Sequence, residues 1–86
     1  MRKMYTINQT LKTNKDLTLY VNDTKKPFYV GVGIIFIVIY AEHYDDCSYY
    51  ELHNDSLDLT IFLWNDEGYE YVDWNFDEID TIQKLS

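Results

Sequence analysis

The chain of 86 residues is long enough for one small domain, and an aromatic content of 17% is typical of a protein with a packed core. A formal net charge of −8 disfavours direct binding of nucleic acid, because affinity for phosphates depends on Lys and Arg. A single cysteine, Cys47, excludes an intrachain disulfide and a cysteine-rich zinc motif, and no signal-peptide pattern opens the chain, so we expect a cytoplasmic protein.

The charge is divided unevenly along the chain. Residues 1–27 hold six basic side chains and two acids, a balance of +4, whereas residues 28–86 hold one lysine and thirteen acids, a balance of −12. Such a field repels nucleic acid and attracts basic groups. We therefore expect a basic protein partner and no direct contact with nucleic acid or a membrane.

The first element, within residues 4–13, fits two descriptions. Met4, Ile7 and Leu11 have helical spacing, whereas Tyr5 and Ile7 alternate as in a strand. Both descriptions stay open, and a short N-terminal helix is favoured.

Two strands are predicted next. DLTLYVN, residues 16–22, alternates apolar and polar side chains and predicts a strand. The apolar residues 28–41 are too few for a helix that spans a bilayer, which needs about 20 residues. Their Val, Ile, Phe and Tyr content instead predicts a strand buried on both faces, opened by Pro27 and bent or bulged at Gly31 and Gly33.

A hairpin is predicted after a short strand at SYYELH, residues 48–53. In residues 57–64, four apolar side chains share one face, opposite a face with Phe62 and Trp64. NDEG then predicts a turn with a positive φ at Gly68, and YEYVDW, residues 69–74, is expected to return as the second strand.

A C-terminal helix is predicted over residues 75–85. Asn75 has the position of an N-cap, Glu78 completes a capping box, and Trp74 is placed to pack on Ile79 as a hydrophobic staple. The acids near this start suit the helix dipole.

Together these elements predict one α+β domain over residues 1–86. It comprises an antiparallel sheet of four or five strands, a short C-terminal helix and, if residues 4–13 are helical, a short N-terminal helix.

Catalytic and metal-binding patterns are not evident in the sequence. Two clusters hold potential ligands, in residues 42–47 and 53–55, and neither matches a zinc or calcium template. Paired acids in polar turns are expected to stay solvated, without the raised pKa of a general acid. We expect no metal, no cofactor and no enzymatic activity.

The acidic and aromatic segment at residues 65–80 is the candidate site, because it has seven carboxylates and no basic residue. On a strand, side chains of one face are about 6.6 to 6.8 Å apart, the same order as phosphates along a nucleic acid. The segment therefore predicts a DNA mimic. The predicted partner-binding residues are Asp66, Glu67, Tyr69, Glu70, Tyr71, Asp73, Asp77, Glu78 and Asp80.

Roles within the segment are also expected to differ. Tyr69 and Tyr71 are the candidate anchors, because Tyr is enriched at the energetic centres of interfaces. We expect Asp66, Glu67 and Glu70 to lie nearest the partner, and the acids at the helix start to be partly structural. In the competing interpretation the acids only solvate the surface, and aromatic side chains of the segment fill the core.

No motif identifies a family. In overall character, a very small acidic, aromatic-rich domain without a catalytic pattern, the chain resembles phage-encoded inhibitors of bacterial defence enzymes, including anti-CRISPR and anti-restriction proteins. That resemblance implies an inhibitor that blocks the DNA or RNA site of a nuclease or another nucleic-acid-binding effector in the host cytoplasm. Two alternatives stay open: an immunity or antitoxin protein against a cationic nuclease toxin, and a self-associating structural protein.

Overall fold

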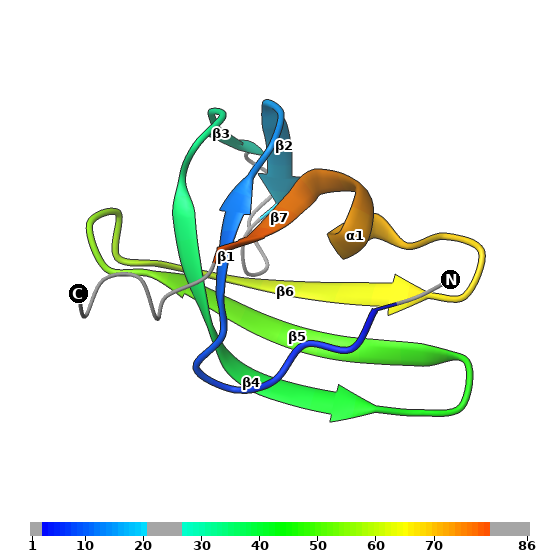
Figure 1. The fold of residues 1–86 in the computed structure, drawn as a ribbon. Helices are drawn as coiled ribbons and strands as arrows, with labels where there is room; N and C mark the ends of the chain where they lie inside the picture. Colours follow the sequence, from blue (N-terminus) through cyan, green and yellow to red (C-terminus); the bar gives the residue numbers. More distant parts are fainter. Residues whose placement is uncertain (1–2, 21–26, 80–86) are drawn as a thin grey trace.

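The structure, a computed structural model that describes residues 3–20 and 27–79, is built around a curled antiparallel sheet of five strands (Figure 1). In sheet order these are β6 (Leu59–Asp66), β5 (Cys47–Asn54), β4 (Ile35–His43), β1 (Thr10–Thr13) and β7 (Phe76–Ile79). A second sheet pairs β2 (Leu17–Tyr20) with β3 (Pro27–Val30), and the helix α1 (Tyr71–Asn75) joins β6 to β7. The predicted antiparallel sheet is confirmed, and a short helix does lie near the C-terminus, although at residues 71–75 rather than at 75–85. The fold is mostly β, so the predicted α+β class is only partly correct.

Strand β4 produces the curl of the main sheet. Its beginning pairs with β1, and the rest pairs with β5 as far as His43 opposite Ser48. The register shifts between Val38 and Tyr40, which marks a β-bulge, and a bulge bends a strand and increases its twist. Figure 1 accordingly shows β5 and β6 crossing the direction of β1 and β7.

The core lies inside the curl and includes side chains from both sheets. Two edge-to-face aromatic pairs connect distant segments: the rings of Phe36 and Phe76 are 5.9 Å apart, and those of Tyr5 and Tyr50 are 5.5 Å apart. Such pairs contribute beyond the area that they bury. The other buried apolar side chains in the described part of the chain are Leu11, Leu17, Leu19, Val30, Val38, Leu52, Leu59, Ile61, Leu63 and Val72.

The long apolar segment forms two strands, β3 and β4, rather than one. The predicted bend is confirmed, with Gly33 at a φ of 87° between the two strands. The buried hydroxyl of Thr13 holds this bend, because it donates to the carbonyl of Gly31 at 2.7 Å and accepts from the amide of Ile34 at 2.9 Å. Burial on both faces was a wrong prediction, since the curled sheet has its core on one face and Ile35 lies exposed on the other.

Residues 3–9 and β1 replace the favoured N-terminal helix, which is therefore a wrong prediction. Asn8 has a φ of 78° in a turn, and the following residues pair with β4 on one side and with β7 on the other. The backbone groups of β1 therefore form hydrogen bonds with two neighbouring strands. The spacing of apolar residues in the sequence does not reveal this stabilisation.

The turn at Gly68 is confirmed, with a φ of 88°, but the hairpin predicted around it does not form. The partner of β6 is β5, and residues 71–75 are helical rather than extended. The side chain of Asn65 explains this local conformation, because its Oδ1 accepts from the amide of the buried Val72 at 2.9 Å.

Within the described ranges, no helix has the length and apolar character needed to cross a bilayer.

The predicted helix start at Asn75 is also wrong, because Asn75 ends α1 and the next four residues form β7. Asn75 is buried, where its Nδ2 donates to the carbonyl of Tyr71 at 2.7 Å and its own carbonyl accepts from the amide of Asn14 at 3.0 Å. Phe76 enters the core and Glu78 pairs along β1, so no capping box forms. The rest of the predicted helix, residues 80–85, lies outside the described residues.

Candidate protein-binding surface

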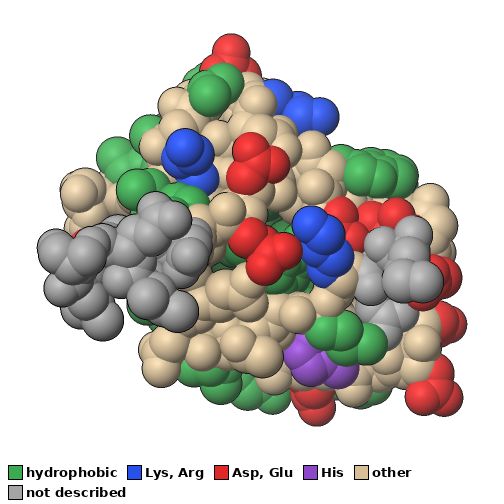
Figure 2. All heavy atoms as spheres, viewed as in Figure 1, with side chains coloured by type: hydrophobic (Ala, Val, Ile, Leu, Met, Phe, Trp, Pro, Cys, Tyr) green, Lys and Arg blue, Asp and Glu red, His purple; other side chains and the backbone are tan. Residues whose placement is uncertain are grey.

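The turn that follows β6 presents the first acids of the candidate segment. Asp66 and Glu67 are exposed there, and two backbone hydrogen bonds between Asp66 and Tyr69, of 3.0 and 3.1 Å, close the turn. The carboxylate of Glu70 accepts from the amide of Gly68 at 2.7 Å and so helps to hold it. Figure 2 shows acidic side chains gathered at the right-hand edge of the molecule, where Figure 1 places this turn and the β4–β5 turn.

Asp73 has a structural position on α1. It accepts hydrogen bonds from the hydroxyl of Tyr5 at 2.6 Å, from the backbone amide of Lys3 at 3.0 Å and from Nδ2 of Asn65 at 3.3 Å. Burial of the phenol and its hydrogen bond to Asp73 raise the pKa of Tyr5. The carboxylate of Asp73 therefore fastens the N-terminal segment to the helix.

Two aromatic side chains of the segment are exposed. Tyr69, 58% exposed, lies against Trp74, with ring centroids 5.2 Å apart, whereas Tyr71 is partly buried against the core. The strand predicted over residues 69–74 does not form, because Tyr69 lies at a turn, and Tyr71 and Asp73 lie in the helix α1. Trp74 packs on Tyr69, and Phe76 is a core residue as the competing interpretation expected.

The last described acids of the segment lie on β7. Asp77 accepts from Nδ2 of Asn14 at 3.1 Å, and Glu78 accepts from Nε2 of Gln9 at 2.8 Å. Glu78 also forms an exposed ion pair of 3.4 Å with Lys3. Asp80 lies outside the described residues. The carboxylates are thus divided between a turn, a helix and a strand, and the evenly spaced row expected on one strand is not formed.

A second candidate surface lies on the outer face of β4, β5 and β6, and the sequence reasoning did not assign it. On β6, Phe62 and Trp64 point away from the core and are 48% and 51% exposed. The ring of Tyr49 lies 5.0 Å from that of Trp64, and Tyr44 stacks on the same indole at 6.2 Å. Tyr40 extends the contact, with its ring 6.1 Å from that of Tyr49. These five residues are called the aromatic face below.

Two carboxylates lie within the aromatic face. The hydroxyl of Tyr40 donates to Glu42 at 3.1 Å, and the hydroxyl of Tyr49 donates to Glu51 at 3.0 Å. The hydrogen bond to Glu42 raises the pKa of Tyr40. Because residues 27–83 contain no Lys or Arg, the carboxylates of β4, β5 and β6 have no Lys or Arg as a neighbour on these strands.

The sequence did carry a signal for the aromatic face. Phe62 and Trp64 occupy the outward positions of an alternating strand, where polar residues are usual, and Tyr49 and Glu51 do the same on β5. What the sequence lacked was the register that places Tyr49 opposite Trp64. The cluster depends on that pairing.

A hollow of about 360 Å³ adjoins the end of the aromatic face and is acidic. It is lined by Asp46, Cys47, Asp66 and Glu67. Cys47 pairs with Asp66 across β5 and β6, one step beyond the pair of Tyr49 and Trp64 on the same face. The turn acids and the aromatic side chains therefore form a continuous surface.

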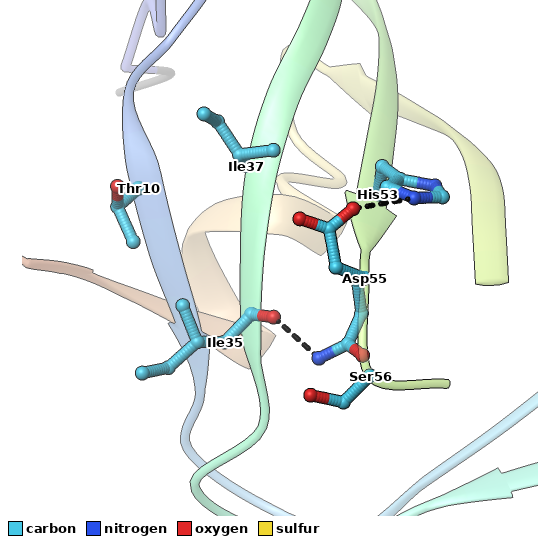
Figure 3. A pocket seen from close by; sticks show the side chains of 7 residues that line it. Thr10, Ile35, Ile37, His53, Asp55 and Ser56 are labelled. Atoms are coloured by element: carbon cyan, nitrogen blue, oxygen red, sulfur yellow. Dashed lines mark hydrogen bonds and ion pairs between the residues drawn. The ribbon is translucent and has the colours of Figure 1, made fainter. Parts of the chain in front are cut away.

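A second hollow, of about 280 Å³, lies at the opposite end of β5 (Figure 3). His53 lines it, with Nε2 3.0 Å from Asp55 and Nδ1 2.8 Å from the hydroxyl of Thr60. The carboxylate, histidine and hydroxyl are in the order of a catalytic relay, but the side chain of Asp55 is 97% exposed. A solvated carboxylate orients a histidine weakly, so we interpret the contact with Thr60 as a cross-strand structural bond.

Among the residues that the structure describes, no group of three or more His, Cys, Asp or Glu side chains is arranged to hold a metal ion.

Comparison of the chain with family models, with curated proteins and with solved structures finds no match.

Proposed function

We propose that this protein is a small acidic inhibitor that binds a basic, nucleic-acid-engaging protein and blocks its DNA or RNA site as a nucleic-acid mimic. The observation that carries this proposal is the run of residues 27–83, which has thirteen acids and no Lys or Arg, together with the exposure of Asp66 and Glu67. A groove that binds phosphates is lined by Arg and Lys, and Arg pairs with a carboxylate in the same bidentate geometry.

The exposure and contacts of each acid indicate whether it contacts the partner or supports the surface. Asp66 and Glu67 are exposed at a turn and are the leading contact residues, with Tyr69 as an aromatic anchor. Glu70 and Asp73 accept hydrogen bonds that hold the turn and the N-terminal segment, so they support the surface.

Asp77 and Glu78 are exposed on β7 and add to the field that a basic partner meets. Since the described acids lie on different elements, the mimicry we propose is one of charge density rather than of regular phosphate spacing. Such a field speeds association and makes it sensitive to salt.

The partner we propose is a nuclease or another nucleic-acid-binding effector in a bacterial cytoplasm. In an RNA-guided nuclease, the arginines that read the sequence flanking the target and the channel for the heteroduplex are natural docking points. An immunity protein would use the same acids against a nuclease toxin. The identity of the captured partner separates these two functions.

Affinity capture from bacterial lysate tests the proposal with a matched pair of variants. Asp66→Asn with Glu67→Gln removes two charges from the turn after β6. Asp55→Asn with Asp58→Asn removes two charges from the turn before β6, and Asn tolerates the φ of 49° at position 58. Both double variants therefore have the same net charge.

We expect wild type and the Asp55/Asp58 variant to recover the same basic nucleic-acid-binding protein, and the Asp66/Glu67 variant to lose it. Raising salt from about 0.05 to 0.5 M is expected to release the complex, because the Debye length falls with ionic strength. Recovery of a partner without a basic nucleic-acid site, or equal recovery by both variants, contradicts the proposal. A mass measurement that gives a stable oligomer instead favours the structural alternative.

A further inference from the structure

The aromatic face is a part of the surface that the acidic segment does not account for. Two large side chains, Phe62 and Trp64, are about half exposed on one strand, and both occupy positions where β6 points away from the core. Aromatic side chains in contact on a sheet surface stabilise strand pairing, which is the structural reason for some of them. Pairing alone does not require them to remain this exposed.

Four of the five rings of the aromatic face form a chain of contacts. Trp64 lies between Tyr49 and Tyr44, and Tyr40 contacts Tyr49 from β4. The cross-strand pair of Tyr49 and Trp64 belongs to an unbroken register between β5 and β6. A partner therefore meets rings that are already ordered, which lowers the entropic cost of binding.

The charge within this face favours one kind of ligand. Glu51 accepts from the hydroxyl of Tyr49, and Glu42 accepts from that of Tyr40 and also hydrogen-bonds with that of Tyr44. An ionised carboxylate has about four acceptor positions, so both carboxylates can accept from further donors. A guanidinium group stacks on aromatic rings and donates to a carboxylate in the plane of its fork. Rings and carboxylates side by side, on strands without Lys or Arg, match the chemistry of an arginine side chain.

We propose that the aromatic face is a docking surface for arginine side chains of a protein partner, which stack on Trp64 and Tyr49 and pair with Glu42 and Glu51. This inference rests on the proposed function, in which the partner is basic, and it adds the face and the side chain that are recognised. The acidic hollow beside Trp64 extends the surface towards Asp66 and Glu67.

Other occupants fit this chemistry less well. Nucleic acid would bring phosphates against Glu42 and Glu51 without a cation on these strands to neutralise them. A second copy docked through the same face would place Glu42 and Glu51 of one copy against those of the other. These like charges repel, and each copy has a net charge of −8.

A synthetic peptide tests the inference without knowledge of the natural partner. The probe is acetyl-Arg-Gly-Arg-amide, and its control is the same peptide with citrulline, which keeps the shape of arginine and removes the charge. Amide and indole shifts in ¹⁵N NMR spectra locate the binding site, with Trp74→Phe in the background so that Trp64 supplies the one indole signal.

We expect the arginine peptide to shift the indole of Trp64 and the amides around Tyr49, and the citrulline peptide to bind about tenfold more weakly or not at all. Trp64→Ala is expected to weaken binding about tenfold, and Glu42→Gln with Glu51→Gln about fivefold. The Asp55/Asp58 variant serves as the charge-matched control and should bind as wild type does.

Equal binding of the two peptides overturns the inference, because recognition would not depend on the cation. Shifts confined to Asp66, Glu67 and Asp77, or no shifts at all, also overturn it. The proposed function fails separately, if lysate capture recovers no basic nucleic-acid-binding protein. Mass measured by sedimentation shows whether the face instead joins two copies, which would likewise contradict it.

Discussion

The hydroxyl of Tyr5 donates a 2.6 Å hydrogen bond to the carboxylate of Asp73, across 68 positions of the sequence. Tyr5 is a core residue, whereas Asp73 belongs to the segment richest in acids. One of the apparent contact residues is thus part of the folded framework.

Asp73→Ala is expected to lower the free energy of unfolding by about 1 to 3 kcal/mol, because it leaves the buried hydroxyl of Tyr5 without its acceptor. Asp73→Asn keeps an acceptor oxygen and should cost less. Urea unfolding followed by fluorescence measures both. If Asp73→Ala is as stable as wild type but no longer captures the partner, Asp73 is a contact residue and its structural role is refuted.

The stability of the protein should decrease above about pH 10. Burial and the hydrogen bond to Asp73 raise the pKa of Tyr5 in the folded state, and burial also raises that of Tyr71. An unfolded tyrosine has a pKa near 10. The unfolded chain therefore releases these protons first, so the stabilisation is complete below about pH 10 and is lost as the pH rises further.

Tyr5→Phe is expected to make this alkaline loss less steep, although it lowers stability at neutral pH by removing the hydrogen bond. Urea unfolding midpoints, measured at several pH values between about 8 and 11, give the slope of stability against pH for both proteins. A variant with the same slope as wild type would show that Tyr5 does not contribute to it.

The hydroxyl of Thr13 is predicted to be necessary for the bend between β3 and β4. Thr13→Val keeps the volume but leaves the carbonyl of Gly31 and the amide of Ile34 without this partner, at an expected cost of about 1 to 3 kcal/mol. Thr13→Ser retains the hydroxyl and should be the milder change. The ranking of the two variants in thermal unfolding checks this, and a Val variant more stable than the Ser variant would contradict it.

Substitution of Phe76 is expected to affect mainly the stability of the fold, and substitution of Trp64 mainly the binding of a partner. Phe76 is 2% exposed against Phe36, so Phe76→Ala should cost about 3 to 5 kcal/mol. Trp64→Ala loses contacts on a half-exposed face and should cost about 1 kcal/mol while it weakens binding of the arginine peptide. A large loss of stability in the Trp64 variant would identify that side chain as mainly structural.

The sequence predicted those elements whose signal is local. Alternation in residues 57–64 identified β6, and the positive φ at Gly68 followed from the composition of the turn. The glycines at 31 and 33 marked the bend between β3 and β4. In each case the conformation depends on neighbouring residues.

The wrong predictions concern mainly elements whose conformation depends on distant partners, although the strands predicted at residues 16–22 and 48–53 are confirmed as β2 and β5. WNFDEID has the chemistry of a helix start, but Phe76 pairs with Thr13 and fills the core beside Phe36, which places residues 76–79 in a strand. The predicted row of acids on one strand failed for a more local reason, since Oδ1 of Asn65 accepts from the amide of Val72, seven positions further along the chain, where residues 71–75 form a short helix. Exposed aromatics on β5 and β6 became a candidate surface only through the register of these two strands.

The measurement that tests the account most directly is displacement of nucleic acid from the captured partner. Fluorescence anisotropy of labelled DNA or RNA bound to that partner would be followed while this protein is added. We predict that wild type releases the nucleic acid at a stoichiometric concentration and that the Asp66→Asn, Glu67→Gln variant does not. A ternary complex, in which the nucleic acid stays bound while this protein also binds, would contradict the account.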